Sequence, residues 1–377
     1  MPQERIYFDN AATTPLDPIV VEEMIDVFNN YFGNPSSLYS YGREAKMRIE
    51  LARKKVAQLL NVQAGEIFFT SGGTESINSA VHMALCDLNC KAIITSEIEH
   101  SATLNAIQDL GNRMDVPIHY LNIKENGHVD LDHLDALLAD LKVKTYVSLM
   151  HANNEIGNIM DVEKAGAICH QHGAIFHCDT VQTISHYPIN LKDNHVHFAS
   201  GAAHKFHGPK GVGLLFINSD IHVKSMLKGG GQERNMRAGT ENISGIVALA
   251  KALEISLTGI GSVEKKIEEL KQYFISQIQK EIPEITFNGD WDGACLYNVI
   301  NLRLPYAASH NMLFMNLDIK GVCVSGGSAC SSGSQTVSHV IKKVYPDIKQ
   351  TPMRISFSKY NTKEEVDRFI KILKETL

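Results

Sequence analysis

Two residues that follow predicted strands carry side chains suited to covalent cofactor chemistry. Lys205 lies in HKFHGPKG (204–211), after an apolar strand and before a Gly-Pro turn, and its amine can form a Schiff base with an aldehyde. Asp179 ends the apolar run AIFHCD, and a carboxylate buried at the carboxyl end of a strand needs a positive partner such as a protonated pyridine nitrogen. On local sequence alone Lys205 is more often a solvated loop lysine, and Asp179 suits a helix N-cap equally well.

A glycine-containing turn offers a place for an anion. The segment TSGGTES (70–76) leads from a predicted strand into a helix that begins at about Thr74, and Gly72 and Gly73 allow a ligand to approach the backbone closely. Free N–H groups and the helix dipole favour phosphate at such a position. The segment matches neither the Walker lysine motif nor GxGxxG, so alone it is a weak indication.

Polar side chains follow further predicted strands. His100, in EIEHSA, can stack on a pyridine ring and move protons near neutral pH, although most of the 17 histidines must be structural. Asn153 and Asn154 follow the strand YVSLM and can hydrogen-bond a ring hydroxyl or shape a turn. Arg354, in MRISFS, suits bidentate capture of an amino-acid carboxylate, or it is an ordinary strand residue.

Two loops complete the set of candidates. GGGQERNMRAGTEN (229–242) combines glycines, arginines and Thr240, and it can embrace a phosphate or contact a second subunit. VSGGSACSSGSQTVSH (324–339) surrounds Cys330 with serine and glycine, which predicts an exposed loop. An exposed thiol on a loop is a candidate nucleophile if nearby cations lower its pKa, and otherwise it is an incidental surface cysteine.

The composition is that of an ordinary globular protein. The 377 residues carry a net charge of −6, which argues against general binding to nucleic acid or anionic membranes. We find no apolar run of about 18 residues and no signal-peptide core, so we expect a cytoplasmic protein. The seven cysteines include no CxxC pair, which argues against a metal site or disulfide framework and fits a reducing compartment.

The order of elements predicts an α/β fold in two parts. Residues 44–60 read as an amphipathic helix, and short apolar runs separated by helical stretches predict a mostly parallel sheet covered on both faces. After about residue 258 a charged helix, short strands and a helix with the capping box Thr362/Glu365 predict a smaller α+β domain. The predicted strands of the first part are 66–71, 91–96, 145–150, 174–179, 196–200 and 211–217.

Taken together, these segments resemble the cysteine desulfurase family, the NifS/IscS-like enzymes of the class V aminotransferase group. The resemblance runs from YFDNAATTPLDP (7–18) through GNPSS (33–37), the EH pair at 99–100 and DTVQ to RISFSKYNTKEE. It implies a fold-type I pyridoxal-phosphate (PLP) enzyme with a seven-stranded sheet and a homodimeric assembly. It further implies a large PLP domain over 12–257 and a small domain made of 1–11 and 258–377.

The resemblance also implies roles for individual residues. Lys205 would be the Schiff-base lysine, Cys330 the sulfur acceptor, and His100 the residue that stacks on the ring and transfers protons. The cofactor would be held by Gly73, Thr74, His100, Asp179, Gln182, His204 and Lys205, with Thr240 reaching the phosphate of the neighbouring subunit. Asn34, Asn154 and Arg354 would bind the substrate, and no metal is implied.

Three positions depart from the family pattern. Ala202 replaces a serine whose hydroxyl is normally aimed at the cofactor phosphate. A hydrogen bond to a charged acceptor is worth roughly 1.5–3 kcal/mol, so we expect weaker PLP binding unless another group or water substitutes. Tyr39 stands where a histidine usually follows GNPSS, and His197 where an aspartate is usual.

The implied reaction converts L-cysteine into L-alanine, with the sulfur held as a persulfide on Cys330 and passed to an acceptor protein. Iron–sulfur cluster assembly and thiolation of tRNA or of a cofactor are all compatible with the sequence. One alternative is a selenocysteine lyase or another class V PLP enzyme. The other is a catalytically weakened sulfur-relay or scaffold-binding protein, which Ala202 would favour and the retained Lys205, Asp179, His100 and Cys330 would not.

Overall fold

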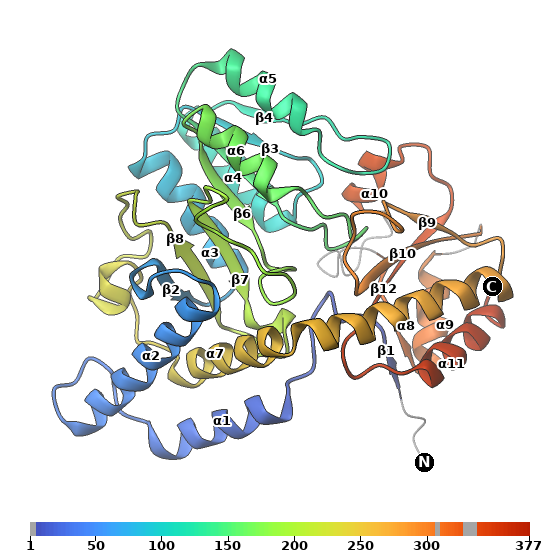
Figure 1. The fold of residues 1–377 in the computed structure, drawn as a ribbon, viewed down its shortest axis with the longest axis horizontal. Coiled ribbons are helices and arrows are strands. Elements are labelled where there is room, and N and C mark those ends of the chain that lie inside the picture. The colour runs from blue at the N-terminus through green and yellow to red at the C-terminus, as the bar shows by residue number, and fades with distance from the viewer. Residues whose placement is uncertain (1–4, 306–309, 327–337) are drawn as a thin grey trace.

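A seven-stranded sheet forms the centre of the larger part of the molecule (Figure 1). The computed structural model describes residues 5–305, 310–326 and 338–377. Within these residues the strand order is β2-β8-β7-β6-β5-β3-β4, and only β8 runs antiparallel to its neighbours. The mostly parallel seven-stranded sheet is therefore confirmed. Its strands are β2 (Ile67–Thr70), β3 (Ala92–Thr95), β4 (Ile118–Tyr120), β5 (Thr145–Met150), β6 (Ile175–Asp179), β7 (Phe198–Ala202) and β8 (Gly213–Ile217).

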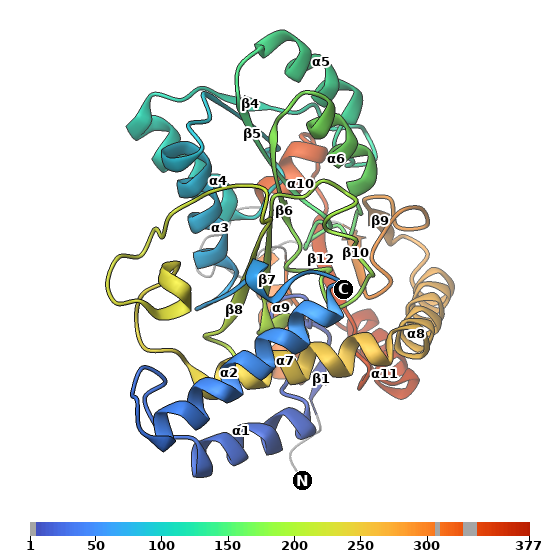
Figure 2. The ribbon, with the colours of Figure 1, turned by 60° about the vertical axis from the view of Figure 1, so that its left-hand side comes forward.

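Helices cover both faces of this sheet, as the apolar strand sequences predict. Successive strand residues enter different cores: Tyr146 packs in one cluster and Val147 in the other. Figure 2 shows the helices on either side. One face packs against α2 (Ser40–Leu59), α5 (Leu131–Leu141), α6 (Val162–Gln171) and α7 (Ile243–Thr258), with α1 (Pro18–Asn30) outside α7, and the other against α3 (Gly73–His82) and α4 (Ser101–Met114).

Strand β4, at the edge of the sheet, is not among the strands predicted from the sequence. This strand has three residues, all half-buried, with His119 between Ile118 and Tyr120. A strand this short and polar lacks the apolar run by which the other six are recognised. It forms because its backbone pairs with β3.

The smaller part contains two further sheets. In the three-stranded antiparallel sheet β10 (Val299–Leu304) lies between β12 (Thr351–Ser356) and β9 (Thr286–Asn288), while β1 (Ile6–Tyr7) pairs in parallel with β11 (Val322–Cys323). The chain's start and end thus share one core (Figure 1). The division of the chain between residues 257 and 258 remains a prediction. The helices here are α8 (Ile260–Glu281), α9 (His310–Ile319), α10 (His339–Val344) and α11 (Lys363–Lys374).

The capping box read from the sequence is present near the end of the chain. The Thr362 side chain accepts from the backbone of Glu365, and the Glu365 carboxylate accepts from the backbone N–H of Thr362, so the capping box at the start of α11 is confirmed. Helices α7 and α8 meet at Gly259 with a bend of 73°. Among the described residues no single helix is long and apolar enough to cross a membrane, and only this bent pair satisfies the length and composition jointly.

A buried ion pair attaches the glycine-rich loop 229–242 to the sheet. The Arg53 guanidinium donates to both carboxylate oxygens of Glu233, at 2.7 and 2.8 Å, and the backbone N–H of Phe69 donates to the same carboxylate at 2.8 Å. Both side chains are 2% exposed. Glu233 adopts a left-handed backbone conformation (φ 46°), which tertiary contacts must stabilise. The loop is therefore held by charge pairing in the core.

We predict that Glu233→Ala lowers the free energy of unfolding by about 3 kcal/mol, because it leaves the Arg53 charge buried without its main partner. Equilibrium urea unfolding measures the change. Glu50 also pairs with Arg53 but is 41% exposed, so Glu50→Ala should cost less than about 1 kcal/mol. Equal effects of the two substitutions would show that burial does not set the strength of this contact.

Candidate active site

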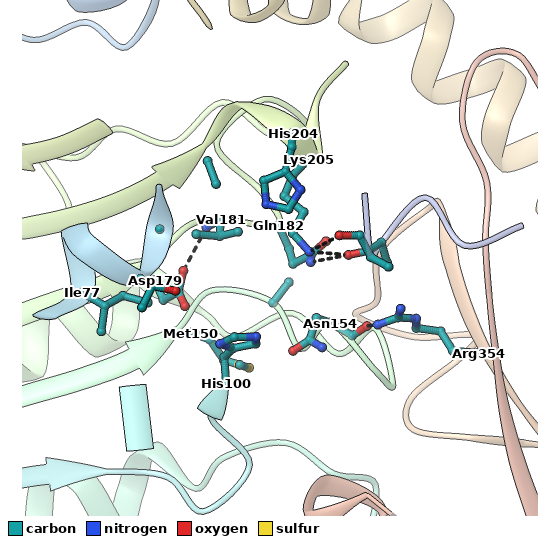
Figure 3. Close-up of a pocket in the computed structure, with 16 residues that line it drawn as sticks. Ile77, His100, Met150, Asn154, Asp179, Val181, Gln182, His204, Lys205 and Arg354 are labelled. Atoms are coloured by element: carbon teal, nitrogen blue, oxygen red, sulfur yellow. Dashed lines mark hydrogen bonds between the residues drawn. The ribbon is translucent and has the colours of Figure 1, made fainter. Parts of the chain in front are cut away.

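A cavity of about 220 Å³ opens where the parallel strands end (Figure 3). Asp179 ends β6, while His100, Asn154 and Lys205 follow β3, β5 and β7. Parallel strands bring their carboxyl ends to one edge of a sheet, so residues far apart in sequence meet there. The lining residues are Ala11, Ala12, Gly73, Thr74, Ile77, His100, Met150, Ala152, Asn154, Asp179, Val181, Gln182, Ala202, His204, Lys205 and Arg354.

Lys205 reaches into this cavity from a short 3-10 helix (Ala203–Lys205) that follows β7. Its Nζ donates to the backbone carbonyls of Ala11 at 2.6 Å and Ala12 at 3.0 Å, as the dashed lines in Figure 3 show. These two acceptors hold the amine against the N-terminal segment at the wall of the cavity. Lys205 therefore lies at the cavity, as its predicted role as the Schiff-base lysine requires.

Asp179 lies at the opposite side of the cavity, 6% exposed. One carboxylate oxygen accepts from the backbone N–H of Val181 at 3.0 Å. Burial raises the pKa of Asp179 to about 6, and the hydrogen bond from Val181 and the charge of Lys205 only partly oppose this shift. The carboxylate thus lacks a cation close enough to offset its burial, which is the condition a protonated pyridine nitrogen would satisfy.

His100 caps helix α4 with its ring. Nδ1 accepts from the backbone N–H of Ala102 at 3.1 Å, so the neutral ring carries its proton on Nε2. Burial, together with the charges of Lys205, His339 and Arg354, lowers the pKa of His100 to about 4. The imidazole is therefore neutral near pH 7 and has one donor, the Nε2–H group.

The start of α3 forms the predicted anion site. Gly72 provides no side-chain cap, which leaves the first N–H groups of this ten-residue helix available to a ligand. A Cβ on Gly73 would lie 2.8 Å from Cγ2 of Val181, so only glycine fits here. Ala202 stands beside Gly73 and presents a methyl group where a serine would present a hydroxyl. His204 completes this side of the cavity; burial lowers its pKa to about 4.

Arg354 and Asn154 lie together on the small-domain side (Figure 3). The Arg354 guanidinium donates to the Asn154 carbonyl at 2.8 Å and to Asp9 at 2.7 Å, which fixes its plane. Its Nε–H is buried and has no hydrogen-bond acceptor among the described residues. Gln182 donates to the Ala11 carbonyl at 3.1 Å, which leaves its own carbonyl for a ligand. The Arg354 guanidinium therefore has an N–H group remaining for a carboxylate.

Two predicted site residues, Thr240 and Asn34, do not line this cavity. Thr240 is exposed and lines a separate pocket with Arg237. Asn34 lies in the exposed loop between α1 and α2, where its side chain accepts from the backbone of Ser36. Cys330 lies outside the described residues. Within one chain the structure thus brings nine of the predicted residues together: Gly73, Thr74, His100, Asn154, Asp179, Gln182, His204, Lys205 and Arg354.

The sequence did not reveal that two backbone carbonyls and one buried carboxyl contribute to this site. The Ala11 and Ala12 carbonyls hold Lys205, yet alanine has no reactive side chain that a sequence could reveal. Glu99 is fully buried beneath His100 and accepts from the backbone N–H of Met150 at 3.0 Å. Burial raises the pKa of Glu99 well above its usual range. In the sequence, the Glu-His pair at 99–100 was the feature that pointed to Glu99.

The other two departures from the family pattern, His197 and Tyr39, do not line the cavity. The His197 ring accepts from the backbone N–H of Phe176 at 3.1 Å, far along the strand from the cavity, and burial lowers its pKa to about 4. Tyr39 is 60% exposed at the start of α2. Only Ala202 changes a group that lines the cavity.

The residues present fit PLP. A buried carboxylate without a cation suits the ring nitrogen, the open start of α3 suits the phosphate, and the oriented amine of Lys205 suits the aldehyde. His100 and Gln182 have donors and acceptors left for the ring and its hydroxyl. Asp179, Lys205, Gly73, Thr74 and His204 would hold the cofactor.

Comparison with known proteins agrees with this geometry. Residues 6–369 match the family model described as aminotransferase class-V. The chain is 39% identical over 379 residues to a protein named cysteine desulfurase IscS from Dictyoglomus turgidum, covering 100% of this chain and 95% of that protein. A solved structure titled NifS-like protein has a TM-score of 0.90 at 37% identity, covering 98% of both chains. One titled SspA in complex with cysteine has a TM-score of 0.80 at 26% identity, covering 94% of this chain and 99% of that one.

We predict that Asp179→Asn stabilises the cofactor-free protein in a pH-dependent way. The pKa of Asp179 is about 6 in the folded protein and near the ordinary aspartate value of 3.8 in the unfolded protein, so the folded state binds more protons between these values. Stability is therefore lost as pH rises from about 4 to about 6, by about 2–3 kcal/mol. The asparagine side chain does not ionise, so the Asp179→Asn protein does not lose this stability as pH rises. Urea unfolding of both proteins at pH 4, 5, 6 and 7 should show a difference that grows with pH; a constant difference would refute the assigned pKa.

Proposed function

The chain belongs to the aminotransferase class-V family, and on that premise we propose that it is a PLP-dependent cysteine desulfurase. Such an enzyme takes sulfur from L-cysteine and releases L-alanine. The names of the similar proteins, cysteine desulfurase IscS and NifS-like protein, support this activity, and the similar structure that contains cysteine supports the substrate.

One observation carries the proposal. The amine of Lys205 and the buried carboxylate of Asp179 lie across one cavity, with the open start of α3 on a third side. An aldehyde, a pyridine nitrogen and a phosphate are the three groups that this arrangement accepts. The presence of Lys205, Asp179 and His100 around one cavity argues against a protein that only relays sulfur or binds a scaffold.

The chain's own residues then position and deprotonate the substrate. When bound, PLP supplies an electron sink for the charge that develops at Cα, and Asp179 keeps the ring nitrogen protonated. Arg354, held by Asp9 and Asn154, binds the substrate carboxylate through its remaining N–H groups. Lys205, which the Ala11 and Ala12 carbonyls hold at the wall of the cavity, removes the hydrogen from Cα.

Sulfur leaves by nucleophilic attack from Cys330. The Cys330 thiolate bonds to the substrate sulfur, the Cβ–S bond breaks, and its electron pair stays on the carbon skeleton, which takes protons and leaves as L-alanine. His100 directs its Nε2–H into the cavity and supplies a proton to this step. The persulfide on Cys330 is then passed to an acceptor protein, for iron–sulfur cluster assembly or thiolation.

We predict that Cys330→Ala abolishes release of L-alanine and sulfide from L-cysteine, by a factor on the order of 100 or more, while bound PLP is unchanged. The assay contains PLP and a reductant. Cys86→Ala is the matched control: it removes an exposed thiol that does not line the cavity, and it should keep full activity. An active Cys330→Ala enzyme would instead favour a lyase that releases the chalcogen directly, as a selenocysteine lyase does.

We also propose a homodimer. An apolar patch on α1, the following loop and α2 is exposed in the single chain, with Phe28 63%, Phe32 73% and Leu38 89% exposed. An exposed patch of this kind indicates an interface. Thr240 lies away from the cavity of its own chain, which supports the proposal that it reaches the phosphate of the neighbouring subunit.

Replacing Phe28 and Phe32 by Asp should convert the dimer into monomers at micromolar concentration, because each substitution puts a charge in the apolar interface. Sedimentation velocity measures the mass. Ile319→Asp, on α9, changes an equally exposed apolar residue (79%) outside this patch and should leave the dimer intact. A monomeric wild-type protein would exclude the homodimer.

A cytoplasmic location is part of the proposal. The six cysteines that the structure describes are all free thiols, and a persulfide carrier requires a compartment in which thiols stay reduced.

A further inference from the structure

Three side chains that bind soft metal ions gather where helices α3 and α4 end. Sγ of Cys86 lies 3.6 Å from Nδ1 of His82 and 3.6 Å from Sδ of Met114. His82 and Met114 are the last residues of α3 and α4, and Cys86 lies in the π-helical turn Met83–Asp87 that follows α3. We call these three residues the Cys86 cluster. Thiolate, imidazole and thioether are the ligands that soft ions prefer.

The backbone fixes where each side chain of the cluster starts. The π-helical turn continues α3 without a break, and the N–H of Leu88 closes it by donating to the Met83 carbonyl at 2.9 Å. Helix α4 ends directly after Met114, where Asp115 adopts a left-handed conformation (φ 54°). Both helices pack against one hydrophobic core. π-Helical turns are rare and often mark functional sites, and this one brings Cys86 against the end of α4.

The separations within the cluster match those of ligands around one metal ion. Bonds of about 2.3 Å to sulfur and about 2.0 Å to an imidazole nitrogen place the ligand atoms roughly 3.5–4 Å apart. Both separations from Sγ of Cys86, at 3.6 Å, fall within this range. Cys86 is exposed and Met114 is 40% exposed, so an ion can reach the sulfur atoms from solvent.

The ligand types favour Cu(I) over divalent ions. Zinc sites use cysteine, histidine and carboxylate side chains, and within the ranges that the structure describes no group of three or more such residues can hold a metal ion. A site at this place therefore depends on the thioether of Met114. Thioether and thiolate sulfur select Cu(I), and the single negative charge of one thiolate balances the single positive charge of this ion.

We propose that the Cys86 cluster is a Cu(I)-binding site in which Sγ of Cys86, Nδ1 of His82 and Sδ of Met114 hold one ion. Binding forms the copper–sulfur bond, breaks the S–H bond of Cys86 and releases its proton to solvent, so no electron is transferred. Burial and the charge of Asp87 raise the pKa of the Cys86 thiol. The ion therefore displaces a proton near pH 7, and its affinity increases as pH rises.

The Cys86 cluster is separate from the candidate active site. None of its three residues lines the cavity at the strand ends. Gly73 begins α3 at that cavity, and a rise of 1.5 Å per residue places Cys86 roughly 20 Å further along the helix. The copper site therefore does not depend on the proposed desulfurase activity.

The test titrates Cu(I), buffered by the chelator bicinchoninate, into the PLP-loaded enzyme without oxygen or thiol reductants. We expect the unsubstituted enzyme to take one equivalent from the chelator and Cys86→Ser to lose it. Met114→Leu and His82→Gln keep every cysteine and should each weaken binding by a factor on the order of 10 or more. Met47→Leu, which changes another exposed methionine (52%), and Cys330→Ala, which removes a different thiol, should both keep this equivalent.

Equal Cu(I) affinity of Met114→Leu, His82→Gln and the unsubstituted enzyme would overturn the proposal, because an exposed thiol alone would then hold the ion. Failure of the unsubstituted enzyme to take Cu(I) from the chelator would overturn it as well. If Cys86→Ser does not fold, Met114→Leu still decides, since it replaces an exposed side chain by one of similar size. Absence of cysteine turnover in copper-free enzyme would contradict the proposed function and leave the copper site standing.

Discussion

The burial of the Asp179 carboxylate without a nearby cation is the constraint on which the site depends. A charge placed at the end of β6 beneath a cavity is costly, and burial accordingly raises its pKa to about 6. The sheet tolerates this cost because seven strands and their helices bury a large apolar core around it. A protonated ring nitrogen beside Asp179 would offset this cost, so the predicted pairing would contribute to the affinity for the cofactor.

The N-terminal segment joins the two parts of the chain at this same place. The Ala11 and Ala12 carbonyls hold Lys205, and the Ala11 N–H donates to Ser356 on β12 at 2.8 Å. Asp9 holds Arg354, which also lies on β12. A movement of the small part therefore changes the position of the lysine and of the predicted carboxylate-binding arginine together.

Burial also decides what the histidines around the site can do. His100, His186 and His204 all have pKa values lowered to about 4, with burial as the largest cause. They are neutral at pH 7, so each contributes a directed hydrogen bond instead of a charge. For His100 and His186 the partner of Nδ1 fixes which nitrogen carries the proton. Among the described residues that line the cavity, Asp179 supplies the carboxylate.

The sequence by itself predicted six of the seven strands and the capped C-terminal helix, and together with the family resemblance it predicted nine residues that line the cavity. Apolar runs of strand length and side chains such as those of Lys205, Asp179 and His100 are visible in a sequence because their chemistry depends on residue type. The short edge strand β4, the carbonyls of Ala11 and Ala12 and the buried acid Glu99 were decided only by tertiary structure. Backbone groups are the same in every residue, and burial arises from contacts between distant segments. Which groups hold Lys205 therefore could not be read before the chain was folded.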